Sequence, residues 1–182
     1  MLPAGLKQVF PLAVLKSSPS TLKRTPRPRF EVAVVLPCSS MGKELRSLAE
    51  LTVFAESFIS NLPQEKGQAT VVGLSGDLGS GKTAFVKAVA KKLGITEDVL
   101  SPTFVIAKYY DLPGMSWKRL VHVDAYRIEQ PEEVRALRFA ELLADPRNLV
   151  MIEWPEQLGE YFPKNARTLH FRFVDETTRE VG

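Results

Sequence analysis

The sequence predicts an α/β fold, a domain in which helices cover a largely parallel central β-sheet. From residue 30 onward, short β-branched runs alternate with segments of helical periodicity, which is the pattern of an α/β layer fold. A glycine-rich turn joins one of these strands to the following helix, and two later apolar strands each end directly before an acidic residue. Because ligands of open α/β sheets lie at the carboxyl ends of the strands, the turn and the two acids should meet at one edge of the sheet.

The first expected elements precede the glycine-rich turn. A strand is expected over residues 31–36 and a helix over residues 43–61. Ser47 and Glu50 have the spacing of a capping box. Apolar residues then recur at helical spacing, at Leu48, Leu51, Ala55, Phe58 and Leu62. The spacing therefore predicts a helix with one apolar face.

The later elements continue the alternation. The strand before the turn is expected over residues 69–75 and the helix after it over residues 81–93, with Phe85, Val89 and Leu93 on its core face. Further strands are expected over residues 104–110, 120–123, 149–152 and 168–174, and short helices from Pro131 and over residues 155–161.

The net charge of +3 is divided unevenly along the chain. Residues 1–30 carry six basic residues and no acidic residue, which leaves 18 basic and 21 acidic residues for the rest. The body is therefore mildly acidic, and its charge does not predict strong binding to nucleic acid. The single cysteine, Cys38, cannot form an internal disulfide, and His122 and His170 are far apart in sequence, so no zinc motif is expected.

Residues 1–29 combine five prolines with serine, threonine and basic residues and lack helical or strand periodicity. We expect a disordered tail there, followed by one domain over residues 30–182. The apolar run over residues 9–15 is too short to span a membrane, and no small-residue cleavage site follows it. The tail is therefore either a solvated appendage or an organellar transit peptide, and the expected location of the protein is the cytoplasm.

The glycine-rich turn matches the P-loop pattern G-x-x-x-x-G-K-[ST]. It consists of Gly76, Asp77, Leu78, Gly79, Ser80, Gly81, Lys82 and Thr83. Glycines let backbone N–H groups approach phosphate oxygens closely, and the following helix points its positive end at the same anion. Lys82 is expected to reach the β- and γ-phosphates and Thr83 to ligate Mg²⁺. The motif predicts nucleotide binding and the three-layer α/β fold of P-loop NTPases; the alternative is a plain glycine-rich turn between a strand and a helix.

Hydrolysis of a bound nucleotide also needs a carboxylate near the metal and a group that positions the attacking water. Asp124 and Glu153 qualify, because each directly follows an apolar strand. Ser101 and Thr103 follow the P-loop helix and are candidate hydroxyl ligands of the γ-phosphate in a switch segment. The alternatives are solvated acids at strand ends and a capped turn. His122 alternates with two valines in a strand and is interpreted as a structural histidine.

Four motifs together resemble, in order and spacing, the small bacterial TsaE (YjeE-type) ATPases of tRNA threonylcarbamoyladenosine (t6A) biosynthesis. They are the P-loop, Ser101-Pro-Thr-Phe104, His122-Val-Asp-Ala-Tyr-Arg127 and Ile152-Glu-Trp-Pro155. The resemblance covers residues 30–175, and few P-loop proteins share the last three motifs. It implies ATP rather than GTP, with Mg²⁺ as the metal. It also implies slow hydrolysis that is stimulated by the TsaB and TsaD subunits of a threonylcarbamoyl transferase complex, with tRNA contacted only indirectly.

The resemblance further implies roles for individual residues. Thr83 and Glu153 would be the Mg²⁺ ligands, and Lys82 would hold the triphosphate. Asp124 corresponds to an essential acid of the family, to which we assign the positioning of water or of a switch. Thr52 matches a threonine near the nucleotide base, with a plain helix-surface threonine as its alternative.

Two other functions fit the same P-loop. A small-molecule kinase has a similar size but usually adds an arginine-rich lid, for which Arg127, Arg135 and Arg138 are the nearby candidates. A non-catalytic, nucleotide-gated binding module would bind ATP without depending on hydrolysis. The P-loop alone does not separate these two functions from a partner-coupled ATPase.

Overall fold

The computed structural model describes residues 42–102, 106–136 and 138–182; the strand expected over residues 31–36 and the tail before it lie outside these ranges. The described residues form one seven-stranded sheet with the spatial order β1-β7-β6-β2-β5-β4-β3. Its strands are β1 (Lys43–Leu45), β2 (Thr70–Gly76), β3 (Ala107–Asp111), β4 (Arg119–Asp124), β5 (Asn148–Glu153), β6 (Arg167–Phe173) and β7 (Arg179–Val181). The P-loop strand, β2, therefore lies at the centre of the sheet.

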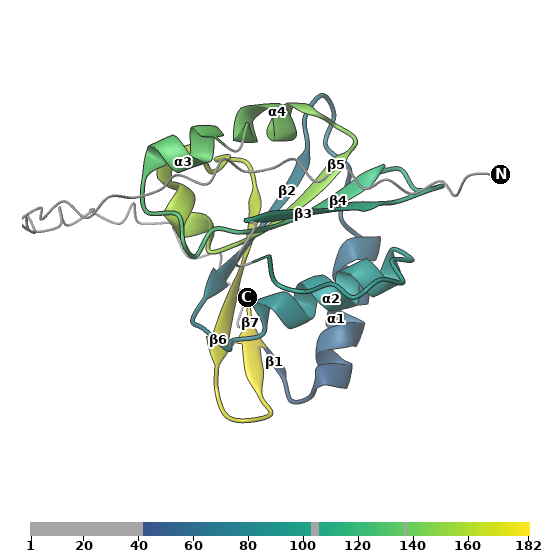
Figure 1. The fold of residues 1–182 in the computed structure, drawn as a ribbon. Helices are drawn as coiled ribbons and strands as arrows, with labels where there is room; N and C mark the ends of the chain where they lie inside the picture. Colours follow the sequence, from purple (N-terminus) through teal and green to yellow (C-terminus); the bar gives the residue numbers. More distant parts are fainter. Residues whose placement is uncertain (1–41, 103–105, 137) are drawn as a thin grey trace, which may run out of the picture. The chain divides into compact units, whose positions relative to one another are not determined.

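The centre of the sheet is parallel and its edges are antiparallel. β2 pairs in parallel with β5 and with β6, and β4 pairs in parallel with β5. β3 runs antiparallel to β4 at one edge, and β7 and β1 continue antiparallel beyond β6 at the other (Figure 1). The largely parallel sheet predicted from the sequence is confirmed.

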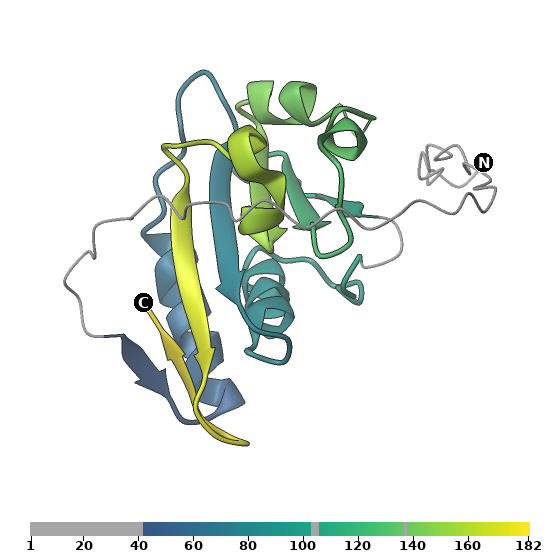
Figure 2. The same cartoon turned by 90° about the vertical axis from the view of Figure 1, so that its left-hand side faces the viewer.

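Helices cover both faces of this sheet. They are α1 (Leu48–Ser60), α2 (Lys82–Lys92), α3 (Pro131–Ala136), α4 (Phe139–Ala144) and the 3₁₀ helix η1 (Pro155–Tyr161). α1 and α2 lie on one face, whereas α3, α4 and η1 lie on the other (Figure 1 and Figure 2). The described residues thus form the three layers predicted for a P-loop NTPase. Within these ranges, no helix has both the length and the apolar character that crossing a bilayer requires.

α1 begins later than its helical periodicity predicts. Residues 43–45, expected inside the helix, form β1 against β7. The helix starts after Ser47, whose side chain accepts a hydrogen bond from the Glu50 amide at 3.1 Å, while the Glu50 carboxylate accepts one from the Arg46 amide at 2.8 Å. The bond to Ser47 satisfies an amide of the first turn that lacks an intrahelical partner, so Ser47 caps the helix as predicted, while Glu50 bonds to the residue before the cap rather than to Ser47 itself. Leu48, the first residue of the predicted apolar stripe, is exposed.

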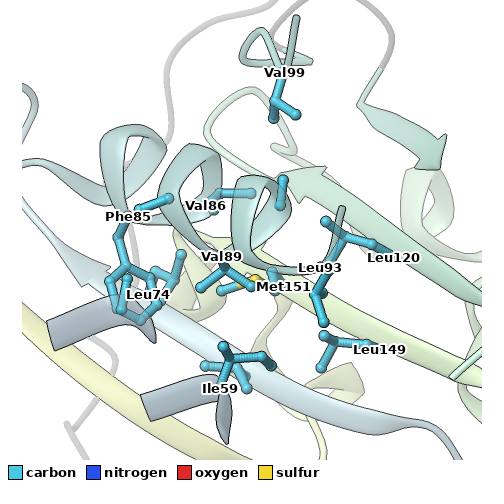
Figure 3. Close-up of a cluster of buried hydrophobic side chains, with 14 of the residues drawn as sticks. Ile59, Leu74, Phe85, Val86, Val89, Leu93, Val99, Leu120, Leu149 and Met151 are labelled. Atoms are coloured by element: carbon cyan, nitrogen blue, oxygen red, sulfur yellow. The ribbon is translucent and has the colours of Figure 1, made fainter. Parts of the chain in front are cut away.

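The main hydrophobic core lies between the sheet and the helices α1 and α2. Phe85 and Val89 of α2 and Leu93, which follows its last residue, are buried, as their spacing predicts. They belong to the same cluster as Leu74 and Met151 of the two central strands (Figure 3). Each such side chain contributes about 1.5–3 kcal/mol when fully buried. This packing holds α2, and with it the end of the P-loop, against β2 and β5.

A second core lies on the opposite face of the sheet. Val121, Val150 and Ile152 of β4 and β5 pack there with Phe139 of α4 and Leu158 of η1. β4 and β5 are therefore covered on both faces, which explains why residues 149–152 of β5 form a continuous apolar run rather than an alternating one.

The sequence prediction misses β1, α4 and β7. β1 and β7 have three residues each and α4 has six, so none of them is long enough to show a clear period. The strand expected over residues 104–110 begins at Ala107 in the described chain, and residues 103–105 lie outside it.

Candidate nucleotide-binding site

The P-loop connects the carboxyl end of β2 to α2 and needs glycine at two positions for different reasons. At Gly76, φ is 134° and a Cβ would lie 2.0 Å from the carbonyl oxygen of Phe171 on β6, so a side chain would collide with backbone. At Gly81, φ is 106°, and this left-handed residue precedes α2 without providing a side-chain cap. The first amides of α2 are therefore left to bind an anion.

Lys82 is buried inside the P-loop. Its Nζ donates hydrogen bonds to the carbonyl oxygens of Gly76 at 2.6 Å and Asp77 at 2.8 Å, and the residue is 4% exposed. Nζ also lies 4.1 Å from the centre of the Trp154 ring. Burial lowers the pKa of Lys82, and the negative charge of Glu153 opposes this shift. A phosphate in the loop would offer the ammonium group a charged acceptor in place of neutral carbonyls.

Thr83 and Glu153 meet at the carboxyl edge of the sheet. The Thr83 hydroxyl oxygen lies 2.8 Å from Oε1 and 3.0 Å from Oε2 of Glu153. Thr83 belongs to the first turn of α2, and Glu153 is the last residue of β5, the parallel neighbour of β2. Glu153 is 4% exposed. The fold thus brings together the two residues that the sequence predicts as Mg²⁺ ligands.

This donor set suits a Mg²⁺ ion that binds together with phosphate. A hydroxyl and a carboxylate supply hard oxygen ligands, and Mg²⁺ usually keeps several waters while taking one or two carboxylates plus substrate phosphates. Among the residues that the structure describes, no group of three or more histidine, cysteine, aspartate or glutamate side chains is arranged to hold a metal ion. The site therefore fits an ion that is shared with a nucleotide better than an ion held by protein alone.

Asp124 lies beside Glu153. It ends β4, where it is the register partner of Glu153 on β5, and it is buried. Its Oδ2 accepts a hydrogen bond from the Ser101 hydroxyl at 2.7 Å, and its Oδ1 accepts one from the Tyr126 amide at 3.1 Å. Both acids therefore lie at the carboxyl ends of adjacent parallel strands, where the ligands of such sheets bind. Ser101 is joined to the same cluster through Asp124.

His122 also contacts this cluster, although the sequence favours a purely structural role for it. The residue is fully buried, and its Nε2 lies 2.8 Å from Oε1 of Glu153. A carboxylate accepts hydrogen bonds, so the contact assigns the proton to Nε2. Nδ1 is buried and has no hydrogen-bond partner within the described residues. The sequence indicates only that His122 and Asp124 point to the same face of their strand, because they are two residues apart. The contact with Glu153 also requires that β4 and β5 are neighbours in the sheet.

Trp154 lies against Lys82. The sequence leaves open whether this residue is part of the core or of a rim, and the structure makes it a half-buried neighbour of the P-loop lysine. Its φ is 60°, and its ring centre lies 5.1 Å from that of Tyr126. A non-glycine residue in this left-handed conformation costs on the order of 1–3 kcal/mol and persists only where its surroundings hold it. Its amide donates to the Leu74 carbonyl at 3.1 Å, which provides one such restraint.

Three further residues that the sequence predicts to bind the nucleotide differ in burial and in contacts. Ser80 is fully buried, whereas Leu78 is 80% exposed. Thr52 donates its hydroxyl hydrogen to the Leu48 carbonyl of its own helix at 2.8 Å, and its expected place near a nucleotide base stays a prediction. Thr103 lies outside the described residues.

Known proteins resemble this chain along most of its length. A family model for "Threonylcarbamoyl adenosine biosynthesis protein TsaE" matches residues 45–181. The tRNA threonylcarbamoyladenosine biosynthesis protein TsaE of Borreliella burgdorferi is 36% identical over 132 residues, covering 72% of this chain and 90% of that protein. The protein of the same name from Rickettsia typhi is 34% identical over 136 residues, covering 74% of this chain and 88% of that protein.

A solved structure shares the fold. The crystal structure of YdiB from Bacillus subtilis matches with a TM-score of 0.58 at 27% sequence identity, covering 79% of this chain and 86% of that one. The resemblance stated from the four motifs, the P-loop NTPase fold and the link to t6A biosynthesis are thereby confirmed. The chain belongs to the TsaE family of threonylcarbamoyl adenosine biosynthesis proteins.

Proposed function

We propose that this protein is a Mg²⁺-dependent ATPase whose hydrolysis serves t6A biosynthesis. The observation that carries the proposal is the 2.8 Å contact between Thr83 at the start of α2 and Glu153 at the end of β5. This contact joins a phosphate-binding loop to a buried acid, and nucleotide hydrolysis needs both parts. Membership of the TsaE family supports the assignment to t6A biosynthesis.

The P-loop binds the β- and γ-phosphates through its backbone amides and the start of α2. Lys82 exchanges the carbonyl oxygens of Gly76 and Asp77, which it contacts at 2.6 and 2.8 Å, for phosphate oxygens. The exchange is favourable because charge-assisted hydrogen bonds are stronger than neutral ones, and burial of the ammonium group strengthens its attraction to an anion. Lys82 therefore holds the triphosphate and stabilises the charge that develops on transfer.

Thr83 and Glu153 would hold a Mg²⁺ ion, which when bound would neutralise negative charge on the phosphates. His122 keeps the Glu153 carboxylate in place through the 2.8 Å hydrogen bond to Oε1. Asp124, next to Glu153 in the sheet register, orients the attacking water. The hydroxyl of Ser101 donates to Asp124 at 2.7 Å, which connects the segment after α2 to the acid that acts on water.

The proposed partners are TsaB and TsaD, the subunits of the threonylcarbamoyl transferase complex, and tRNA is contacted only through them. Residues 31–182 carry 18 basic and 21 acidic residues, so this part of the chain lacks the basic excess of a protein that binds nucleic acid directly. We place the ATPase domain at residues 30–182, with residues 1–29 as a tail, and the protein in the cytoplasm.

A small-molecule kinase has less support. Arg135 donates a hydrogen bond to the Tyr161 hydroxyl at 2.9 Å, and Arg138 donates one to Glu141 at 2.7 Å. Two of the three arginines that would form a kinase lid are thus bound to neighbours in their own layer. A kinase would also convert a metabolite to its phosphate ester, whereas the proposed ATPase releases free phosphate.

Release of inorganic phosphate, measured with and without the purified TsaB–TsaD pair, tests the proposal. We expect slow release by the protein alone and faster release with the pair. Lys82→Ala should remove the activity, whereas Lys87→Ala, which changes an exposed lysine of the same helix, should retain it. Equal rates of phosphate release with and without the pair would contradict the proposed stimulation by TsaB and TsaD. Unchanged ATP turnover in Lys82→Ala would contradict the assignment of the P-loop as the nucleotide site.

A further inference from the structure

The hairpin formed by β6 and β7 lies next to the P-loop. Phe171 of β6 is the register partner of Gly76 at the end of β2. β7 returns antiparallel to β6, with Arg179 opposite Phe173. Because the ligands of parallel sheets bind beyond the carboxyl ends of the strands, the turn that follows β6 and the start of β7 lie at the ligand edge of the sheet.

Arg179 contacts the P-loop directly. Its Nε donates a hydrogen bond to the carbonyl oxygen of Gly79 at 3.3 Å, across 100 positions of sequence. Its Cγ lies 3.8 Å from the position that a Cβ on Gly81 would occupy. A guanidinium group is therefore fixed beside the loop that we propose to bind the phosphates.

The hairpin holds this guanidinium in one orientation. Nη1 donates to the carbonyl oxygens of Asp175 at 2.5 Å and Thr178 at 2.8 Å, and Cζ lies 4.5 Å from the centre of the Phe173 ring. Asp175 is itself fixed, because its carboxylate accepts hydrogen bonds from the amides of Thr177 and Thr178 at 2.9 and 2.7 Å. Within the described residues, Nη2 of Arg179 has no hydrogen-bond partner. The guanidinium is thus oriented in advance and keeps donors for a ligand.

The positions of the acids indicate which end of a nucleotide faces this hairpin. Glu153 and Asp124 end β5 and β4, on one side of β2, whereas β6 and β7 lie on the other side. A nucleotide whose γ-phosphate and metal lie at the acids must extend its α-phosphate and nucleoside away from them. On the basis of the proposed nucleotide site, we infer that Arg179 is a nucleotide-binding residue whose guanidinium contacts the phosphate next to the ribose.

Two substitutions separate a charge contact from simple support of the loop. Arg179→Gln keeps a donor for the Gly79 carbonyl but removes the charge, and Arg179→Lys keeps the charge. Arg172→Gln is the matched control, because Arg172 lies on the other face of the same hairpin, where it pairs with Glu180. Each variant and the wild-type protein would be titrated calorimetrically with ADP and with ATP in the presence of Mg²⁺, at low and at high salt, after its melting temperature has been checked.

We expect Arg179→Gln to bind both nucleotides about tenfold more weakly, since a lost hydrogen bond to a charged group usually has at least this effect. Its affinity should also depend less on salt. Arg179→Lys should recover part of the affinity, and Arg172→Gln should match the wild-type protein. Unchanged nucleotide affinity in Arg179→Gln would overturn the inference, as would weaker binding of ATP but not of ADP by this variant. The inference is also overturned if Arg179→Gln binds both nucleotides more weakly with an unaltered salt dependence and Arg179→Lys recovers none of the affinity. A wild-type protein that binds neither nucleotide contradicts the proposed function instead.

Discussion

Thr83 and Glu153 are 70 positions apart in the sequence, yet the Thr83 hydroxyl oxygen lies 2.8 and 3.0 Å from the two carboxylate oxygens of Glu153. The contact forms because β5 is the parallel neighbour of β2, so that the end of β5 lies beside the first turn of α2. His122 on β4 bonds to the same carboxylate at 2.8 Å. The proposed metal ligands are therefore oriented by protein contacts alone.

Replacing His122 by phenylalanine should impair the use of Mg²⁺ more than the binding of nucleotide. Phenylalanine fills similar space but cannot donate a hydrogen bond to Glu153. Loss of such an outer contact lowers metal affinity about 10–100-fold, so half-maximal phosphate release should require correspondingly more Mg²⁺. His122→Gln, whose amide can donate, should recover part of the effect. If His122→Phe melts like the wild-type protein and keeps the same Mg²⁺ midpoint, Glu153 does not depend on His122.

Replacing Asp124 by asparagine should lower kcat while leaving ATP affinity nearly unchanged. The amide oxygen can still accept the hydrogen bond from Ser101, but the carboxylate that we propose to orient the attacking water is lost. Loss of a carboxylate that assists the attack of water reduces rates about 100-fold or more. Asp111→Asn, which changes an exposed acid at the end of β3, is the matched control. Phosphate release at saturating ATP measures the effect, and equal rates in Asp124→Asn and the wild-type protein would remove Asp124 from the mechanism.

Nucleotide binding should change the fluorescence of Trp154 and not that of Trp117. Lys82 Nζ lies 4.1 Å from the Trp154 ring centre, and we propose that it moves toward phosphate. Trp117 is buried in the core, where its Nε1 donates to the Thr70 hydroxyl at 3.0 Å. Because the chain has two tryptophans, titration of Trp117→Phe with ATP should retain the signal and titration of Trp154→Phe should lose it. A signal that persists in Trp154→Phe argues against the movement of Lys82.

Asp145 should stabilise the fold in a pH-dependent way. Hydrogen bonds from the side chain and the amide of Arg147 hold the pKa of Asp145 well below its usual range, and Arg119 adds a contact at 2.9 Å. Because the pKa is lower in the folded state than in the unfolded state, the charged carboxylate stabilises the folded protein. This stabilisation is fully present above the unfolded-state pKa of about 3.9 and is lost as the pH falls through the folded-state pKa.

Asp145→Asn should consequently unfold at a lower urea concentration than the wild-type protein at neutral pH. The difference between the two midpoints should shrink in acid, below the unfolded-state pKa. Urea unfolding at a series of pH values measures it, and a difference that stays constant from neutral to acid pH rules out the charge on Asp145 as its cause.

The elements that the sequence predicts well are those whose signals lie within a few consecutive residues. The capping box of Ser47 and Glu50 and the P-loop between β2 and α2 are local patterns, and the structure has them at the predicted residues. β1 and β7 are missed because they are short and because their pairing, Lys43 with Val181 and Leu45 with Arg179, joins distant parts of the chain. Such edge strands form through tertiary contacts rather than through local propensity.

The residues of the candidate site likewise differ in whether local sequence signals predict them. Asp124 and Glu153 could be selected from the sequence because each ends an apolar strand, and parallel strands bring their carboxyl ends to one edge. The contacts of His122 with Glu153 and of Arg179 with Gly79 depend on which strands are neighbours in the sheet. A single sequence contains no signal for that order, so these two contacts required the structure.

Calorimetric titration with ATP, in the presence and absence of Mg²⁺, tests most directly whether the P-loop binds ATP with a metal held by Thr83 and Glu153. The wild-type protein should bind ATP more tightly with Mg²⁺ than without it. Thr83→Ala and Glu153→Gln should lose this difference, and Lys82→Ala should bind little or no ATP. A wild-type protein that does not bind ATP, or an unchanged effect of Mg²⁺ in both metal-ligand variants, would contradict the assignment of the site.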